Sequence, residues 1–370
     1  LRNKEIFIHY FVEDSVAFML SVLPDTVIMV RQKLNAGAMN QVTDFMRYCS
    51  NKQQLNSHYD QFSFLSHALY KNLFEPLQLP PGRVILCLDN FFLPFETLCT
   101  DDRGARFLIY DYVFSYVYSA RYLLKKMDAH AAKGKFIGFA PVAFKPYLGL
   151  PELKHSAQYL QKSASHYDET MLFMNSKASK QNFMHAVPDY SIVNIFSHAQ
   201  ADTADFEPIL YMQDSVIHLS ELQLLNRPAT RLIMLSACQT NAGRSATGEG
   251  IYSLARGFST AGIPSVAATL WKADEATIYA VSDKFNEYLA AGMRKDDALR
   301  KAKLYFMEHG EKEQLLPFYW ANMVLLGNAD PILFPDHATA SWWWLWMAIP
   351  ALAWIIYVII DKQRKKIVKK

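Results

Sequence analysis

Two reactive side chains directly follow uniformly apolar segments of the sequence. His198 follows the segment SIVNIFS (191–197), and Cys238 follows the segment RLIMLSA (231–237). Uniform apolar runs of this length are typical of strands covered on both faces, so both residues are expected at the carboxyl ends of strands, where open parallel sheets collect catalytic groups. If the two strands are neighbours, the thiol and the imidazole lie side by side as a nucleophile and its general base.

The same two residues also admit a structural interpretation. Cysteine is among the most buried residue types, and a histidine after an apolar strand is usually a hydrogen-bonded part of the core. A catalytic role is favoured because both residues stand at the ends of expected strands and are followed by small or polar residues, which leave backbone N–H groups available. Glycines at 243, 248 and 250 add flexibility nearby. Spacing alone leaves both interpretations open.

Other catalytic and metal-binding motifs are incomplete or missing from the sequence. The segment GRSATGEG (243–250) has the glycine spacing of a phosphate loop, but Glu249 occupies the lysine position and would repel phosphate. There is no GxSxG or HExxH motif and no GxGxxG behind a strand. The 11 histidines lack metal-ligand spacing, and the four cysteines lack a CxxC pair. We therefore expect neither a cofactor nor a metal ion.

The elements that must position these residues alternate between strands and helices. Residues 1–31 predict three short strands in a meander, followed by helices at 41–49 and 59–74 and a turn at 79–83. Further strands are expected at 84–89, 136–140, 191–197, 231–236, 265–270 and 323–326, and further helices at 151–165, 177–186, 250–261, 274–291 and 295–310. This alternation is typical of an α/β domain in which helices cover both faces of a parallel sheet.

Several segments together resemble the CHAT domain family, a caspase-like, separase-related group of clan CD cysteine peptidases. FSHAQAD (196–202) is similar to the histidine motif of the family, and LSACQTNAG with GEGIYSLARGFSTAGIPSVAATLWKADEA (together 235–276) is similar to its cysteine motif. Other matching segments are FFLPFETL (91–98), YVFSYVYSA (112–120), LPELKHSAQYL (150–160) and PFYWANMVLLGN (317–328). The resemblance covers nearly all of the chain that precedes its apolar C-terminal segment.

The resemblance implies a caspase-like three-layer α/β/α sandwich with a mostly parallel central sheet that hydrolyses peptide bonds. Cys238 would be the nucleophile, and His198 would be the base and then the acid for the leaving group. The backbone N–H groups of Cys238 and Ala199 would hold the oxyanion. The family usually has glycine at the position of Ala199, so a conformation with positive φ there would strain the site.

For substrate specificity, the sequence offers only candidate residues. Related peptidases that cut after Arg or Lys commonly carry an aspartate two residues before the nucleophile, where this chain has Ser236. Weak candidates for an acidic substrate pocket are Asp202, Glu249, Asp274 and Glu275. Each of these four also fits a solvated loop or a helix cap, and Asp274 in particular fits an N-cap.

The charge of the chain is divided between a nearly neutral body and a basic C-terminus. The 370 residues are 51% hydrophobic and 20% charged with a net charge of +3, of which the last ten residues contribute +5 and the other 360 contribute −2. Nucleic-acid binding needs basic residues spread over a folded face, so we expect no nucleic-acid partner. Residues 341–360 (SWWWLWMAIPALAWIIYVII) carry no charge, and they have the length and the terminal aromatic residues of a transmembrane helix in a lipid bilayer.

The predicted organisation has five parts. These are an N-terminal region of strands and helices (1–78), a caspase-like catalytic core (79–335), a linker (336–340), a single transmembrane helix (341–360) and a basic tail (361–370). The positive-inside rule places the tail in the cytoplasm and, for one crossing, the catalytic domain outside, whereas family habit favours the cytosol, so the side of the catalytic domain stays open. CHAT proteins commonly carry upstream tetratricopeptide repeats that bind a partner, and the start at Leu1 is consistent with such repeats.

Two functions of different classes follow from the sequence. The first is a membrane-anchored cysteine endopeptidase that cleaves a protein or peptide substrate and is regulated through upstream repeats or an activating partner, in bacterial signalling or defence. A zymogen that stays inert until a partner orders the pocket is a variant of it. The second function is a catalytically silent CHAT-fold scaffold at the membrane, for which Ala199 is the main argument.

Overall fold

The computed structural model describes most of the chain up to residue 334. The described residues are 4–13, 15–34, 37–89, 91–124, 132–200, 207–225, 228–236, 249–271 and 275–334, with the backbone alone for 249–254. The chain divides into the units Leu1–Ile332 and Leu333–Lys370. All the elements below belong to the first unit.

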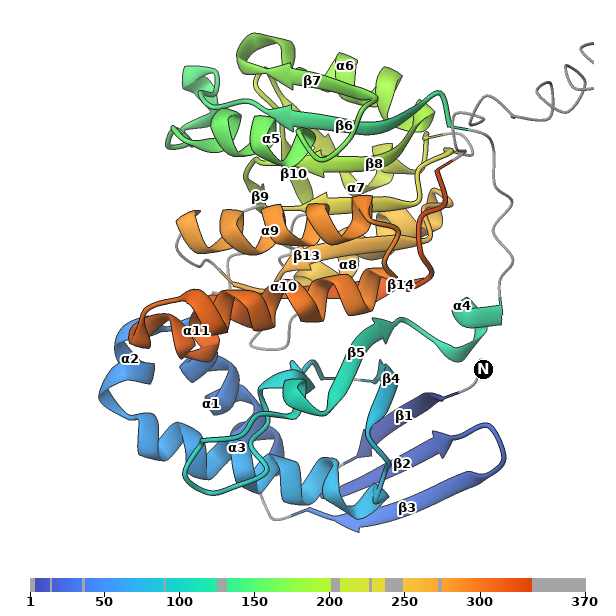
Figure 1. Ribbon diagram of the computed structural model, residues 1–370, viewed down its shortest axis with the longest axis vertical. Coiled ribbons are helices and arrows are strands. Elements are labelled where there is room, and N and C mark those ends of the chain that lie inside the picture. Colours follow the sequence, from blue (N-terminus) through green and yellow to red (C-terminus); the bar gives the residue numbers. More distant parts are fainter. Residues whose placement is uncertain are drawn as a thin grey trace, which may run out of the picture. The chain divides into compact units, whose positions relative to one another are not determined.

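An eleven-stranded mixed sheet runs through this unit (Figure 1). Its strands lie in the order β3 (Val27–Lys33), β2 (Val16–Val22), β1 (Glu5–Glu13), β4 (Gly82–Leu88), β5 (Tyr112–Val117), β14 (Met323–Gly327), β13 (Ser265–Thr269), β12 (Leu232–Leu235), β8 (Tyr190–Ile195), β6 (Gly134–Ala140) and β7 (Thr170–Met174). Neighbouring strands are parallel except in the pairs β2·β3, β1·β2 and β13·β14. The predicted mostly parallel sheet and the N-terminal meander are therefore confirmed.

The antiparallel pairing of β13 with β14 divides most of the sheet into two parallel groups. Strands β1, β4, β5 and β14 run in one direction, and β13, β12, β8, β6 and β7 run in the other. The carboxyl ends of β8 and β12 therefore lie at one edge of the sheet, and those of β1 and β4 lie at the opposite edge. Every residue of β12, β13 and β14 is buried, which explains their uniformly apolar sequences.

Helices cover both faces of the part of the sheet that contains β8 and β12. Helix α5 (Ser156–Ala164) links β6 to β7, and α8 (Glu249–Thr260) links β12 to β13. These two crossover connections lead to neighbouring strands in opposite directions across the sheet. Since parallel crossovers are right-handed, α5 and α8 lie on opposite faces. Helix α9 (Glu275–Ala290) packs against α5 and against α10 (Lys295–His309), and all three are seen in front of the strands in Figure 1.

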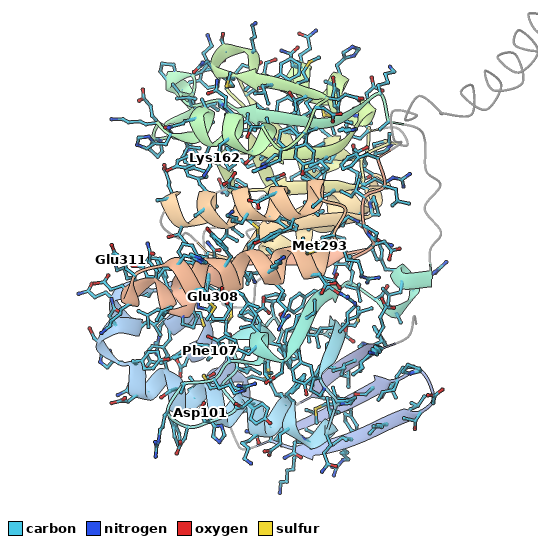
Figure 2. All side chains as sticks on the ribbon, viewed as in Figure 1. Asp101, Phe107, Lys162, Met293, Glu308 and Glu311 are labelled. Carbon is cyan, nitrogen blue, oxygen red and sulfur yellow. The ribbon has the colours of Figure 1, made fainter. Side chains whose placement is uncertain are left out.

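A shared carboxylate ties α9 to the end of α5. Asp283 of α9 is bound by Lys162 of α5 at 2.8 Å and by His166, two residues beyond α5, at 2.9 Å. Lys162 projects from α5 beside α9 in Figure 2. Because the Asp283 carboxylate is only 9% exposed, the two partners compensate for its burial.

The helices near the N-terminus are amphipathic. In α1 (Ala38–Ser50), Val42, Phe45, Met46 and Cys49 are buried at a helical spacing, and Phe45 stacks on Phe62 with ring centroids 5.3 Å apart. This spacing agrees with the helices predicted for the segment after the meander. The other helices are α2 (Lys52–Ser57), α3 (Tyr59–Leu73), α4 (Ala120–Leu124), α6 (Lys180–Ala186), α7 (Leu219–Leu222) and α11 (Pro317–Trp320).

The predicted linker, transmembrane helix and basic tail (336–370) lie outside the described residues. Among the helices that the structure does describe, none has both the length and the apolar character needed to cross a bilayer.

Candidate active site

The two strands that precede the candidate catalytic residues are neighbours. β8 and β12 pair in parallel with Ile195 opposite Leu235, and the Ser236 N–H donates to the Ile195 carbonyl at 3.0 Å. His198 stands three residues beyond Ile195, and Cys238 stands three residues beyond Leu235. The two strands thus meet the condition under which the sequence predicts a thiol and an imidazole side by side. Cys238 itself lies outside the described residues, so its place beside His198 stays a prediction.

His198 is held inside the protein at the end of β8. The residue is 2% exposed, its Nε2 donates to the carbonyl of Pro151 at 2.9 Å, and its ring lies 5.0 Å from the ring of Phe144. A carbonyl oxygen only accepts, so this bond assigns the proton of a neutral imidazole to Nε2. Nδ1 is then the nitrogen that can take up a proton, which is the state a general base requires.

The loop between β6 and α5 contains both Pro151 and Phe144, which contact the ring of His198. Val142 has φ 63°, an unusual value for a β-branched residue, and a tight turn there brings the Ala143 N–H to the Pro141 carbonyl at 2.8 Å. The Leu153 N–H returns to the Val142 carbonyl at 2.8 Å, which closes the loop. Backbone strain of this kind persists only where the surroundings impose it.

The helix predicted at 151–165 is shorter in the structure. It begins at Ser156, so Pro151 and the four residues after it belong to the loop. The backbone groups of this stretch are used in other ways, since the Pro151 carbonyl accepts from His198 and the Leu153 N–H donates to Val142. Pro151 and Phe144 are the residues near His198 that sequence reasoning missed. No residue type marks a backbone carbonyl as a hydrogen-bond acceptor for a side chain, so the sequence carries no signal for it.

Ala199 lies in an extended strand. It begins β9 (Ala199–Gln200), which pairs antiparallel with β10 (Ile209–Tyr211), and β10 pairs with β11 (Val216–His218). The described non-glycine residues with positive φ are Lys4, Gln78, Val142 and Asn175, so Ala199 does not carry the strain expected for an alanine at a glycine position.

The pairing of β9 with β10 also orients the Ala199 N–H. The Tyr211 N–H donates to the His198 carbonyl at 2.9 Å, so these two residues form a hydrogen-bonded pair. The next pair, Ala199 with Leu210, is then of the non-hydrogen-bonded type, in which backbone groups point away from the partner strand. The Ala199 N–H is therefore directed away from β10.

Ser236 is committed to a structural contact. It is 2% exposed, and its hydroxyl lies 3.2 Å from the hydroxyl of Ser282 in α9. A carboxylate at this buried position would keep only the Ser282 hydroxyl as a neighbour from this pair, too little to compensate for the burial of a charge.

The predicted acidic pocket residues are only partly within the described chain. Glu275 begins α9 and Glu249 begins α8, and both helices start at the edge of the sheet where β8 and β12 end. Asp202 and Asp274 lie outside the described residues. The backbone of Glu275 and of Glu249 therefore lies at the same edge of the sheet as His198, and the role of the four acids in a substrate pocket stays a prediction.

Comparison with solved structures identifies proteins of similar fold. The chain is similar to a chain in each of two crystal structures of the Saccharomyces cerevisiae separase–securin complex, with TM-scores of 0.59 and 0.58 and 10% identity over 90% and 89% of this chain. It spans 30% of the length of that chain in both. A likeness at this identity shows a shared fold.

Two further matches are cysteine proteinase structures. The Arg-specific gingipain R has a TM-score of 0.48 and 12% identity, covering 74% of this chain and 67% of that one. The Porphyromonas gingivalis complex of RgpB pro- and mature domains has a TM-score of 0.46 and 12% identity, covering 80% and 77%.

Family membership follows from the sequence itself. No curated protein matches the chain by sequence. The model of the CHAT domain, however, matches residues 64–328, a range that contains β4–β14, the histidine at the end of β8 and the segment after β12. On this match, and in agreement with the resemblance seen in its motifs, the chain belongs to the CHAT domain family.

Proposed function

We propose that the chain is a caspase-like cysteine endopeptidase that cleaves a protein substrate through Cys238 and His198. The observation that carries the proposal is the parallel pairing of β8 with β12. Ile195 is paired with Leu235, and His198 and Cys238 each follow their strand by three residues. CHAT family membership and the separase-like fold support the same reaction class. The fold by itself does not establish a reaction, because one fold hosts many functions.

In the proposed reaction, the sulfur of Cys238 attacks the carbonyl carbon of the scissile peptide bond. His198 takes the thiol proton on Nδ1 and transfers it to the leaving amine, and a water molecule then hydrolyses the thioester. The Pro151 carbonyl keeps its bond to Nε2–H throughout, so it orients the ring and stabilises the imidazolium that forms. The N–H of Ala199, which points away from β10, and the N–H of Cys238 would hold the oxyanion.

Selective alkylation of the thiols tests this proposal. We expect iodoacetamide at pH 7 to modify Cys238 of the full chain in detergent at least about 100-fold faster than the other three cysteines, read by peptide mass spectrometry. Cys49, Cys87 and Cys99 are buried, and burial raises the pKa of Cys87 to about 11 and that of Cys99 to about 12. At pH 7 their thiolate fractions are therefore on the order of 10⁻⁴ and 10⁻⁵.

The His198→Ala variant serves as the comparison in this experiment. If His198 activates the thiol, the variant slows the alkylation of Cys238 and leaves the three buried cysteines unchanged. Equal reactivity of all four cysteines in the native chain would instead indicate a silent scaffold, and a rate that does not respond to His198→Ala would rule out the dyad.

We also propose that residues 341–360 anchor the peptidase to a bilayer with the basic tail in the cytoplasm, and that a protein partner acts through an upstream region. The uncharged apolar run and its basic flank support the anchor. The partner is suggested by the separase chain, which was crystallised with securin.

The anchor is tested by flotation with liposomes after an alkaline wash. We expect the full chain to float and a chain ending at residue 335 to stay in the soluble fraction. A chain ending at residue 360, which lacks only the basic tail, is the matched control and should still float. Washing the full chain off the liposomes, or flotation of the chain ending at 335, would disprove the anchor.

A further inference from the structure

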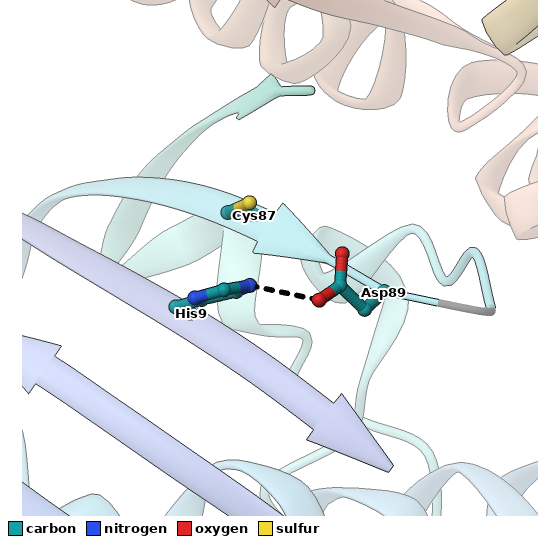
Figure 3. Close-up of side chains that lie close together, drawn as sticks. All are labelled: His9, Cys87 and Asp89. Atoms are coloured by element: carbon teal, nitrogen blue, oxygen red, sulfur yellow. Dashed lines mark hydrogen bonds and ion pairs between the residues drawn. The ribbon is translucent and has the colours of Figure 1, made fainter. Parts of the chain in front are cut away.

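Three metal-ligating side chains of different types converge where the carboxyl end of β4 lies beside the middle of β1 (Figure 3). One imidazole nitrogen of His9, the sulfur of Cys87 and one carboxylate oxygen of Asp89 all lie within 4.8 Å of one another. Within this group, Nε2 of His9 and Oδ2 of Asp89 are 3.0 Å apart. This cluster lies at the edge of the sheet opposite to His198, so it is separate from the candidate active site.

The pairing of the strands brings these three residues onto one face of the sheet. His9 and Cys87 are directly opposite each other in the parallel pair β1·β4. Asp89 is two residues beyond Cys87, so it points to the same side, and its N–H donates to the Tyr10 carbonyl at 3.2 Å, which continues the strand pairing past β4. The backbone of all three residues is therefore held in place by the sheet.

The cluster is apolar on one side and open on the other. Cys87 is 1% exposed and packs with Phe7, Ile85 and Val117 in a buried apolar group. The side chains of His9 and Asp89 are 36% and 42% exposed. A cation can therefore approach from the side of His9 and Asp89, where solvent can supply water as a further ligand.

We propose that His9, Cys87 and Asp89 bind one divalent transition-metal ion of the zinc type, with water completing a four-coordinate site. The donor set of imidazole nitrogen, thiolate sulfur and carboxylate oxygen is one that zinc uses, whereas magnesium and calcium are bound by oxygen alone. The thiolate and the carboxylate together carry two negative charges, which balance those of the cation.

The distances suit such a site after small side-chain rotations. Zinc bonds of about 2.0–2.3 Å in a tetrahedron place ligand atoms about 3.3–3.8 Å apart. The His9–Asp89 pair at 3.0 Å must open slightly, and the distances from Cys87 to both, which are within 4.8 Å, must shorten by at most about 1.5 Å. The partly exposed side chains of His9 and Asp89 can make these movements. A bound ion would link β1 to β4, where the N-terminal meander joins the rest of the sheet.

Cobalt(II) is the probe for this site, because it takes zinc positions and reports thiolate ligation in its absorption spectrum. The full chain with Cys238→Ala, in detergent with a non-thiol reductant, is freed of metal and titrated with cobalt chloride. The Cys238→Ala change removes the other candidate thiolate. We expect one cobalt per chain, a thiolate-to-cobalt charge-transfer band and the strong visible bands of four-coordinate cobalt, all displaced by added zinc.

Ligand variants make the test specific. Cys87→Ser should abolish the charge-transfer band, and His9→Gln and Asp89→Asn should each weaken cobalt binding about tenfold or more. The last two replace partly exposed side chains, so they stay informative even if Cys87→Ser does not fold. Matched controls are Cys99→Ser, a buried cysteine elsewhere, and His166→Gln, which breaks another histidine–aspartate pair at 2.9 Å.

The result that overturns the proposal is equally defined. It is the absence of a charge-transfer band in the chain with all three ligands intact, or unchanged cobalt affinity in both His9→Gln and Asp89→Asn. Loss of binding in the two control variants would likewise place the cobalt elsewhere. The Cys238→Ala background makes these outcomes independent of whether the chain is a peptidase.

Discussion

Replacing His198 with alanine is expected to lower kcat/KM for peptide hydrolysis by about 10³-fold or more, without unfolding the protein. The imidazole is the only group in the proposed mechanism that takes the proton of Cys238 and returns it to the leaving amine. Its Nε2 is already committed to the Pro151 carbonyl at 2.9 Å, so no tautomer change is needed before Nδ1 acts. The measurement is the initial rate of cleavage of a peptide library by the full chain.

A neighbouring histidine provides the control for this prediction. His155 is exposed, and it lies in the same segment as Pro151. His155→Ala should leave kcat/KM within about twofold. Residues that act as one unit are not additive, so the double variant of His198→Ala and Cys238→Ala should lose no more activity than Cys238→Ala alone. A double variant that loses the product of the two single losses would show that the residues act independently.

Gly327→Ala is expected to cost about 2–5 kcal/mol in the free energy of unfolding. Gly327 has φ 97°, which an L-residue rarely adopts, and an added Cβ would lie 2.2 Å from the carbonyl oxygen of Pro264. That carbonyl accepts the Asn328 N–H at 2.8 Å, and Gly327 is paired with Ser265 at the end of β14. Neither Gly327 nor the Pro264 carbonyl can move away without opening the β13·β14 pair, which joins the two parallel groups of the sheet.

The control separates the two causes of this loss. Gly292 also has positive φ, at 79°, but an added Cβ there meets no heavy atom within 4 Å. Gly292→Ala should therefore lose only the conformational part, about 1–2 kcal/mol. Urea denaturation of both variants gives the comparison. If the two losses agree within about 0.5 kcal/mol, the contact with Pro264 is not the constraint that the structure indicates.

The parts of the fold that could be predicted from the sequence are those with strong local patterns. The runs SIVNIFS and RLIMLSA are apolar throughout because β8 and β12 are covered on both faces, and the meander appears as short segments between turn residues. The strands β5 and β7 were not predicted. β7 is an edge strand of five residues, too short for a periodic pattern, and β5 is matched only as a motif of the family.

The position of His198 could be predicted for the same reason, whereas its contacts depend on long-range packing. His198 follows a strand that the pattern defines, so its place at the sheet edge could be expected. The loop that holds it could not, because the 151–155 segment has a sequence compatible with a helix. Its backbone groups are taken by Val142 and His198 instead, a choice that depends on tertiary contacts.

The family, the α/β class and the strand ends that carry the candidate dyad follow from the sequence, because motifs and apolar periodicity are local properties. The tertiary structure adds that β8 and β12 are neighbours, that Pro151 orients His198 and that Ala199 lies in a strand without positive φ. It alone also placed His9 beside Cys87 and Asp89. These residues are distant in the chain, and what joins them is the register of β1 against β4, which is set by packing over the whole sheet.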